Sequence, residues 1–285
     1  MRLTGRARRT LTALGWIAAL VAVGAGVAVL PLRYDPLPVG SPWRFAWEGV
    51  VLAFAFFIAT ALVGRRLAGL SWNALGWNGA ESGAGRFAAG TVLGVAMAAV
   101  AVGLALLSGA TLGARPNGGG AFAAAAPPAV ALLGAALAEE LVFRGAPLSL
   151  LARAVGPWRA TLILALGFGA AHVANPNATV FSTLNIACAA ILLSVAFLSA
   201  GGMPLAWGLH FGWNAGQGIV FAAPVSGIGF AASPLVYTAG HHAWADGGAF
   251  GPEGGLAATI AMAGGVAVLV GRRLARPREW LAWAP

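Results

Sequence analysis

The chain has 285 residues, of which 59% are hydrophobic and only 9% are charged, and its mean hydropathy is +0.83. Soluble domains carry about 25% charged residues, so this composition excludes an ordinary soluble domain and indicates a polytopic membrane protein. The formal net charge is +9, and every basic residue is an arginine. These arginines flank apolar stretches, which favours a role in topology and contacts with anionic lipid over nucleic-acid binding.

Eight apolar stretches are candidates for membrane-spanning helices, since a helix needs roughly 17 to 25 residues to cross the hydrocarbon core. In chain order they are 11–31, 45–63, 87–108, 128–152, 158–174, 179–199, 204–222 and 256–271. The arginines before the first stretch resemble the start of a signal peptide, but that stretch is too long for one and an uncleaved helix is favoured. The predicted fold class is therefore all-α, a polytopic transmembrane bundle of about eight helices.

The arginines are distributed unevenly between the two sides of such a bundle. One side holds Arg2, Arg6, Arg8, Arg9, Arg65, Arg66, Arg86, Arg153, Arg159, Arg272, Arg273, Arg276 and Arg278, and the other holds Arg33, Arg44 and Arg115. The positive-inside rule then predicts a multi-pass protein of the cell membrane with both termini in the cytoplasm.

The connecting segments have different characters. Residues 110–127 are glycine-rich and predict a flexible outer loop, and 223–255 predict a longer outer segment. Segment 67–86, with its tryptophans, is a candidate interfacial helix, and the tail 278–283 is a candidate interfacial anchor. The single cysteine, Cys188, lies in an apolar run, excludes an intramolecular disulfide and is expected to be a small packing residue.

The first polar motif lies in the fourth stretch and reads Glu139-Glu140-Leu-Val-Phe-Arg144. Ionisable residues are costly at membrane depth, so they indicate a functional site. Glu140 and Arg144 are four residues apart and can pair on one helix face, whereas Glu139 points about 100° away. A structural ion pair between helices explains Glu140 and Arg144 but leaves Glu139 unexplained. We therefore expect Glu139 to face a cavity.

Two further stretches each supply a histidine. Phe168 and His172 are four residues apart, so the phenyl ring can pack beside the imidazole and fix its rotamer. His210 and Asn214 have the same spacing and present an imidazole and an amide to one space. Each histidine alone is compatible with ordinary hydrogen-bonded packing between helices. His241 and His242 lie in a predicted outer loop and are given no role.

These three motifs, in this order on successive apolar stretches, resemble the CAAX-processing and bacteriocin-processing (CPBP) family of intramembrane proteases. The resemblance covers 128–215, which would be the motif-bearing core of a single domain over 1–285. It implies an intramembrane endopeptidase with a peptide or membrane-protein substrate and surrounding lipids as partners. By the same resemblance, Glu139 and His172 would activate the attacking water and His210 and Asn214 would stabilise the tetrahedral intermediate. Glu140 and Arg144 would support them.

The residues leave two mechanisms open. Without a metal, Glu139 is the general base. With one, Glu139, His172 and His210 resemble the two-histidine, one-carboxylate set of catalytic zinc sites, with the fourth position left for water. Cys188 and Ser194 have no evident partner base as nucleophiles. The alternative functions are a non-catalytic membrane scaffold or immunity-type protein, and a small proton-coupled transporter.

Overall fold

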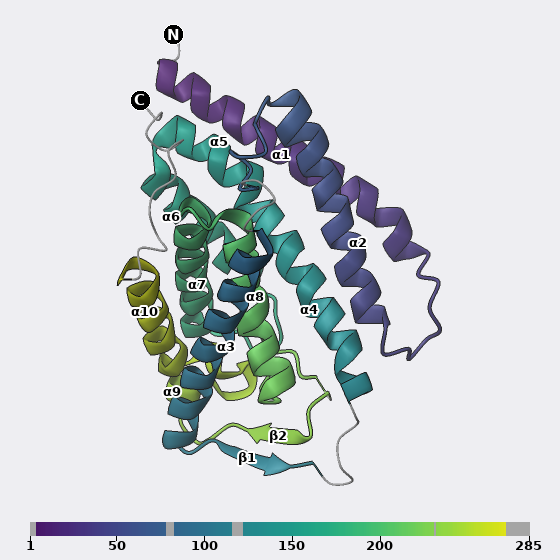
Figure 1. Cartoon of the computed structure of the whole chain (residues 1–285), viewed down its shortest axis with the longest axis vertical. Helices are drawn as coiled ribbons and strands as arrows, with labels where there is room; N and C mark the ends of the chain where they lie inside the picture. The colour runs from purple at the N-terminus through teal and green to yellow at the C-terminus, as the bar shows by residue number, and fades with distance from the viewer. Residues whose placement is uncertain (1–3, 78–82, 116–121, 231, 272–285) are drawn as a thin grey trace.

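The structure, a computed structural model, describes residues 4–77, 83–115, 122–230 and 232–271. It is a bundle of helices with one small sheet, which confirms the predicted all-α class (Figure 1). The helices are α1 (Gly5–Arg33), α2 (Arg44–Ala59), α3 (Gly83–Leu107), α4 (Phe122–Phe143), α5 (Gly145–Val155), α6 (Pro157–Ala171), α7 (Val180–Leu198), α8 (Gly202–Ala215), α9 (Ala243–Asp246) and α10 (Leu256–Gly271). Two π-helical segments, η1 (Thr60–Leu67) and η3 (Gly216–Val220), continue α2 and α8. Short 3-10 turns, η4 (Gly248–Phe250) and η5 (Pro252–Gly254), precede α10.

Each of the eight predicted stretches contains a helix at the expected place. Within the described ranges, five spans are long and apolar enough to cross a membrane by length and composition: Gly5–Arg33, Arg44–Leu67, Gly83–Leu107, Ala124–Val155 and Val180–Leu198. The last stretch forms α10, a shorter apolar helix. These helices support a membrane protein, and the orientation of its termini stays a prediction.

The fourth span is broken near its polar motif. α4 ends at Phe143, α5 starts at Gly145, and Arg144 between them has φ −109° and ψ −59°. α5 lies across one end of the bundle, next to the first turns of α1 (Figure 1). α4 starts at Phe122, so Pro127 and Pro128 lie inside the helix and not in its first turn.

Small residues allow α3 and α8 to pack closely. A Cβ atom on Gly90 or Gly94 would overlap the backbone of α8, and one on Gly208 or Gly212 would overlap the backbone of α3. Close backbone approach through small residues is a common way for helices to associate in lipid. α8 is also fastened to α4, because the indole Nε1 of Trp207 donates to the carbonyl of Leu133 at 2.9 Å. α8 is therefore held on two sides.

Three expectations about connecting segments and packing were wrong. The start of the glycine-rich loop is a strand, β1 (Thr111–Ala114), which pairs antiparallel with β2 (Leu235–Thr238) because two edge strands satisfy each other's backbone groups. In segment 67–86, η1 ends at Leu67, residues 68–77 form irregular chain and turns with Leu70 and Leu75 fully buried, and 83–86 begin α3, so the predicted interfacial helix is not seen in the described part. Cys188 is exposed on α7 rather than packed. The tail 278–283 and the arginines after Gly271 lie outside the described residues.

Candidate active site

The predicted polar residues meet around one cavity of about 60 Å³, which has room for a few water molecules. Six helices, α3, α4, α6, α7, α8 and α10, and the segment 223–255 form its walls. The lining residues are Met97, Glu139, Phe168, His172, Ile186, Ala189, Leu192, Leu193, Leu209, His210, Trp213, Asn214, Ser226, Glu253 and Met262. The polar groups therefore face a largely apolar chamber.

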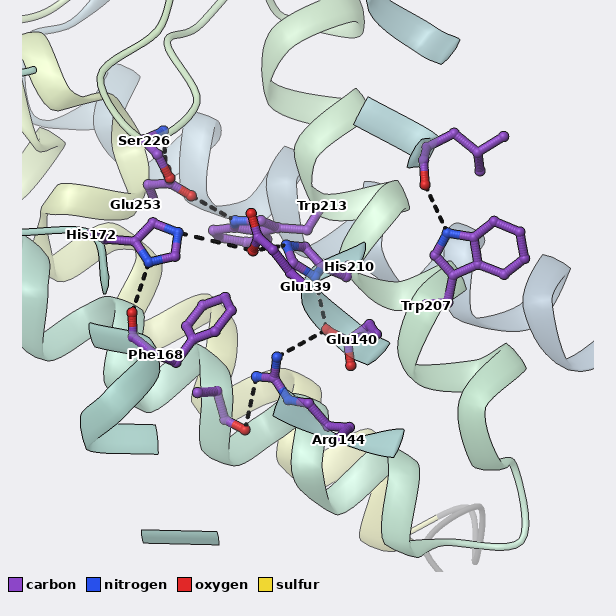
Figure 2. A network of polar contacts seen from close by, with 12 residues as sticks. Glu139, Glu140, Arg144, Phe168, His172, Trp207, His210, Trp213, Ser226 and Glu253 are labelled. Atoms are coloured by element: carbon purple, nitrogen blue, oxygen red, sulfur yellow. Dashed lines mark hydrogen bonds and ion pairs between the residues drawn. The ribbon is translucent and has the colours of Figure 1, made fainter. Parts of the chain in front are cut away.

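Glu139 lies between the two imidazoles (Figure 2). Its Oε2 atom is 3.9 Å from Nε2 of His172 and 3.7 Å from Nε2 of His210. The side chain is 36% exposed, more than either histidine. One carboxylate oxygen thus faces two ring nitrogens across a gap that a hydrogen-bonded water can bridge.

In both imidazoles, the nitrogen that faces away from Glu139, Nδ1, has a hydrogen-bond partner. Nδ1 of His172 lies 2.7 Å from the carbonyl oxygen of Phe168, one turn earlier in α6. A carbonyl only accepts, so Nδ1 carries the proton of this bond and a neutral His172 presents the lone pair of Nε2 to the cavity. The Phe168 ring packs on the imidazole with centroids 4.6 Å apart, as the four-residue spacing predicted.

His210 is held by the second glutamate. Its Nδ1 lies 2.8 Å from Oε1 of Glu140, which is fully buried. The same oxygen accepts from Nη1 of Arg144 at 3.1 Å, which confirms the predicted pair. Arg144 also donates to the carbonyl of Ala190 at 3.3 Å, and its guanidinium lies 4.5 Å from the centroid of the Phe168 ring. Glu140 and Arg144 therefore form a buried support behind the cavity.

Glu253 is a cavity residue that the sequence motifs did not identify. It is 4% exposed, and its carboxylate accepts from Nε1 of Trp213 at 3.0 Å, from Nε2 of Gln217 at 3.4 Å and from the backbone N–H of Ser226. Asn185 on α7 donates to the carbonyls of Glu253 and Gly255, which fixes this turn against the bundle. The only signal in the sequence is its rarity, since the chain has eight acidic residues.

The structure leaves the other candidates away from the cavity. His241 and His242 are exposed, as expected for loop residues. Ser194 is buried and donates its hydroxyl to the carbonyl of Ala190, a bond within its own helix.

The possible metal ligands have suitable donor chemistry. Zinc-binding histidines usually donate their second ring N–H to a carbonyl or carboxylate, as Nδ1 of His172 and Nδ1 of His210 can do here. In the residues that the structure describes, however, no group of three His, Cys, Asp or Glu side chains is spaced to hold a metal ion. Zinc at this site therefore remains a prediction.

The fold and the cavity together define a polytopic helical protein with paired acidic and imidazole groups in a largely apolar cavity. Residues 121–216 match the family model described as type II CAAX prenyl endopeptidase Rce1-like. This confirms the resemblance to the CPBP family over a segment that holds every predicted motif residue. At the family level the match supports a membrane endopeptidase of the CAAX-protease type, a hydrolase of peptide or protein substrates. Comparison with curated proteins and with solved structures gives no match.

Proposed function

We propose that the chain is an intramembrane endopeptidase that hydrolyses its substrate with a water molecule activated by Glu139 and His172. The observation that carries this proposal is the position of Glu139 Oε2, 3.9 and 3.7 Å from two imidazole nitrogens in a cavity that has room for water. A general base must lie within hydrogen-bonding reach of the water, directly or through one intermediate.

In this mechanism, the water hydrogen-bonds to Glu139 Oε2 and to the lone pair of His172 Nε2. Its oxygen forms a bond to the scissile carbonyl carbon while one of its protons moves to Glu139. The carbonyl becomes an oxyanion. The C–N bond then breaks, and the proton held by Glu139 passes to the leaving amine, which restores the carboxylate.

His210 and Asn214 stabilise the oxyanion. A doubly protonated His210 donates Nδ1–H to Glu140 and directs Nε2–H into the cavity, where Asn214 contributes its amide N–H. Donors fixed in advance are effective here, because removing a single oxyanion donor costs about 10²–10³ in rate in well-studied proteases.

The test is quantitative proteomics of membrane fractions from cells that carry the wild type, Glu139→Gln or His172→Ala. Both variants should accumulate the same uncleaved precursors, because each removes a contact to the attacking water. Glu48→Gln is the matched control, since Glu48 is an exposed carboxylate on α2 outside the cavity. Normal processing by Glu139→Gln, produced at the wild-type level, would disprove the proposed mechanism.

The zinc version makes a separate prediction. If a zinc ion binds, Glu139, His172 and His210 would hold it, and the ion would supply a water of lowered pKa. Elemental analysis of the purified protein should then find about one zinc per chain. The zinc should be absent from His210→Ala and retained in Glu48→Gln. Equal zinc content in wild type and His210→Ala would rule out this set of ligands.

A further inference from the structure

A second cavity lies at the other end of α5 from the polar motif, between α1 and α5. Its volume is about 320 Å³, and it opens at the surface. Its lining residues, called the arginine groove below, are Arg8, Arg9, Thr12, Ala13, Trp16, Ala68, Leu150, Arg153 and Ala154. Figure 1 shows the two helices side by side at the end of the bundle where the N-terminus lies.

The groove gathers positive charge from two separate helices. Arg8 and Arg9 come from the first turns of α1, and Arg153 comes from the last turn of α5. Neither helix, nor η1 beside them, contains an aspartate or glutamate. Within the described ranges the ion pairs of arginine involve only Arg44 and Arg144, so these three guanidinium groups have no acidic partner there. The groove therefore attracts an anion.

The groove has charged residues at its mouth and apolar residues further in. Arg6 donates to the carbonyl of Val155 at 3.3 Å, so the end of α5 lies against the start of α1. Trp16 is two turns further along α1 than Arg9, about 10 Å by helical rise, and Leu150 is one turn before Arg153. The three arginines are exposed, whereas Trp16 and Leu150 are half-buried. The arginines thus form the outer rim, and an indole and a leucine lie deeper in the groove.

We propose that the arginine groove binds the phosphate headgroup of an anionic phospholipid. A phosphate accepts several N–H bonds from guanidinium groups, and basic pockets between transmembrane helices bind such headgroups. The apolar depth favours a lipid over a free phosphate ion, because a lipid places acyl chain beside Trp16 and Leu150 below its headgroup. Lipid binding here would fasten α1 to α5, which follows the Glu139 helix directly.

The test is native mass spectrometry of the purified full chain in neutral detergent, with dioleoylphosphatidylglycerol as the probe and dioleoylphosphatidylcholine as the neutral reference. The wild type should retain the anionic lipid preferentially. Arg153→Gln should weaken its binding about 5-fold, and Arg8→Gln/Arg9→Gln/Arg153→Gln about 100-fold, since each arginine near an anionic surface contributes on that scale. Phosphatidylcholine binding should not change.

The matched control removes the same charge elsewhere. Arg65→Gln/Arg66→Gln/Arg159→Gln takes three exposed arginines that do not line the groove and should keep anionic-lipid binding within about 3-fold. Equal losses in both triple variants would show nonspecific attraction and overturn the proposal. Inorganic phosphate at millimolar concentration should not displace the lipid, and Trp16→Leu should weaken lipid binding. Full displacement by phosphate, with no effect of Trp16→Leu, would identify a soluble anion instead.

If the triple variant does not purify, the single variant Arg153→Gln is sufficient to test the lipid site. Arg153 is exposed and its loss should leave the fold intact. Unchanged phosphatidylglycerol binding by that variant would refute the site. Neither result depends on proteolysis, so the lipid site and the proposed function can fail separately.

Discussion

The two adjacent glutamates have different environments, so replacing each should affect a different property: stability for Glu140 and cleavage for Glu139. Glu140 is fully buried between Arg144 and His210, whereas Glu139 is 36% exposed and faces the cavity. This contrast at the scale of single residues separates support of the site from chemistry within it.

Replacing Glu140 by alanine should destabilise the fold by about 3–5 kcal/mol, because the buried guanidinium of Arg144 loses its counter-charge. Glu139→Gln should change stability by only about 0.5 kcal/mol or less while it abolishes cleavage. Thermal unfolding of both variants in the same detergent measures the difference. Glu140→Gln, Arg144→Gln and the double variant Glu140→Gln/Arg144→Gln form a double-mutant cycle. The double variant should lose less stability than the sum of the two single losses, as expected for residues in direct contact. Equal stability of Glu139→Gln and Glu140→Ala would contradict this division of roles.

Glu253 should influence the site through Trp213, its neighbour on α8. Glu253→Gln places an amide N–H₂ group where three N–H donors converge, which should cost about 1–3 kcal/mol and displace α8 near Asn214. Cleavage per folded molecule should therefore fall. Asp246→Asn is the matched control, since Asp246 is also buried and accepts from backbone N–H groups of Gly240 and Gly248, but it does not line the cavity.

The double variant with Trp213→Phe distinguishes a specific contact from general loosening. If Glu253 acts through the indole, Glu253→Gln/Trp213→Phe should cleave no more slowly than the slower single variant. Multiplicative losses would mean that the two residues act independently. Asp246→Asn should lower the melting temperature but leave the cleavage rate of the folded fraction unchanged.

At the scale of the elements, the close packing of α3 on α8 positions His210, which lies between Gly208 and Gly212. Gly212→Ala would press a methyl group into the backbone oxygen of Thr91 and should destabilise the fold by about 1–3 kcal/mol, with a matching loss of cleavage. Gly103→Ala on α3 is the control, because a Cβ there meets nothing within 4 Å. Alanine is the better helix former, so this variant should be stabilised by about 0.5–1 kcal/mol. Melting temperatures that fall equally in both variants would show that the α3–α8 contact is not tight.

The elements also show how far the sequence could predict the site. Helical periodicity brings Glu140 to Arg144 and Phe168 to His172, and the structure has both contacts. Helical periodicity could not identify Glu253, because this residue lies in a turn about 40 residues after Trp213 and no local spacing links it to α8. β1 was missed for a related reason: its partner strand β2 comes more than a hundred residues later, and a glycine-rich stretch reads as a loop until that partner is known.

For the whole molecule, the distribution of unpaired arginines predicts which way the bundle lies in the membrane. Among the described residues, the arginines at the N-terminal end have no acidic partner, as in the groove formed by Arg8, Arg9 and Arg153. Two arginines at the other end are engaged by the protein itself. Arg44 pairs with Asp35 at 2.7 Å, and Arg115 donates to the carbonyls of Ser233 and Leu235. The asymmetry of available positive charge is thus greater than the count of arginines suggests.

The positive-inside rule then predicts that the N-terminal end is cytoplasmic and that the β1–β2 sheet lies on the opposite side. In a Cys188→Ser background, Gly113→Cys on β1 should react with a membrane-impermeant maleimide in intact cells, and Gly5→Cys at the start of α1 should react only after permeabilisation. Both glycines are exposed, and a Cβ on either meets nothing within 4 Å, so neither substitution should disturb the fold. The reverse labelling pattern would invert the topology. It would also place the arginine groove in the outer leaflet, where anionic lipid is scarcer and the groove's charge would have no comparable partner.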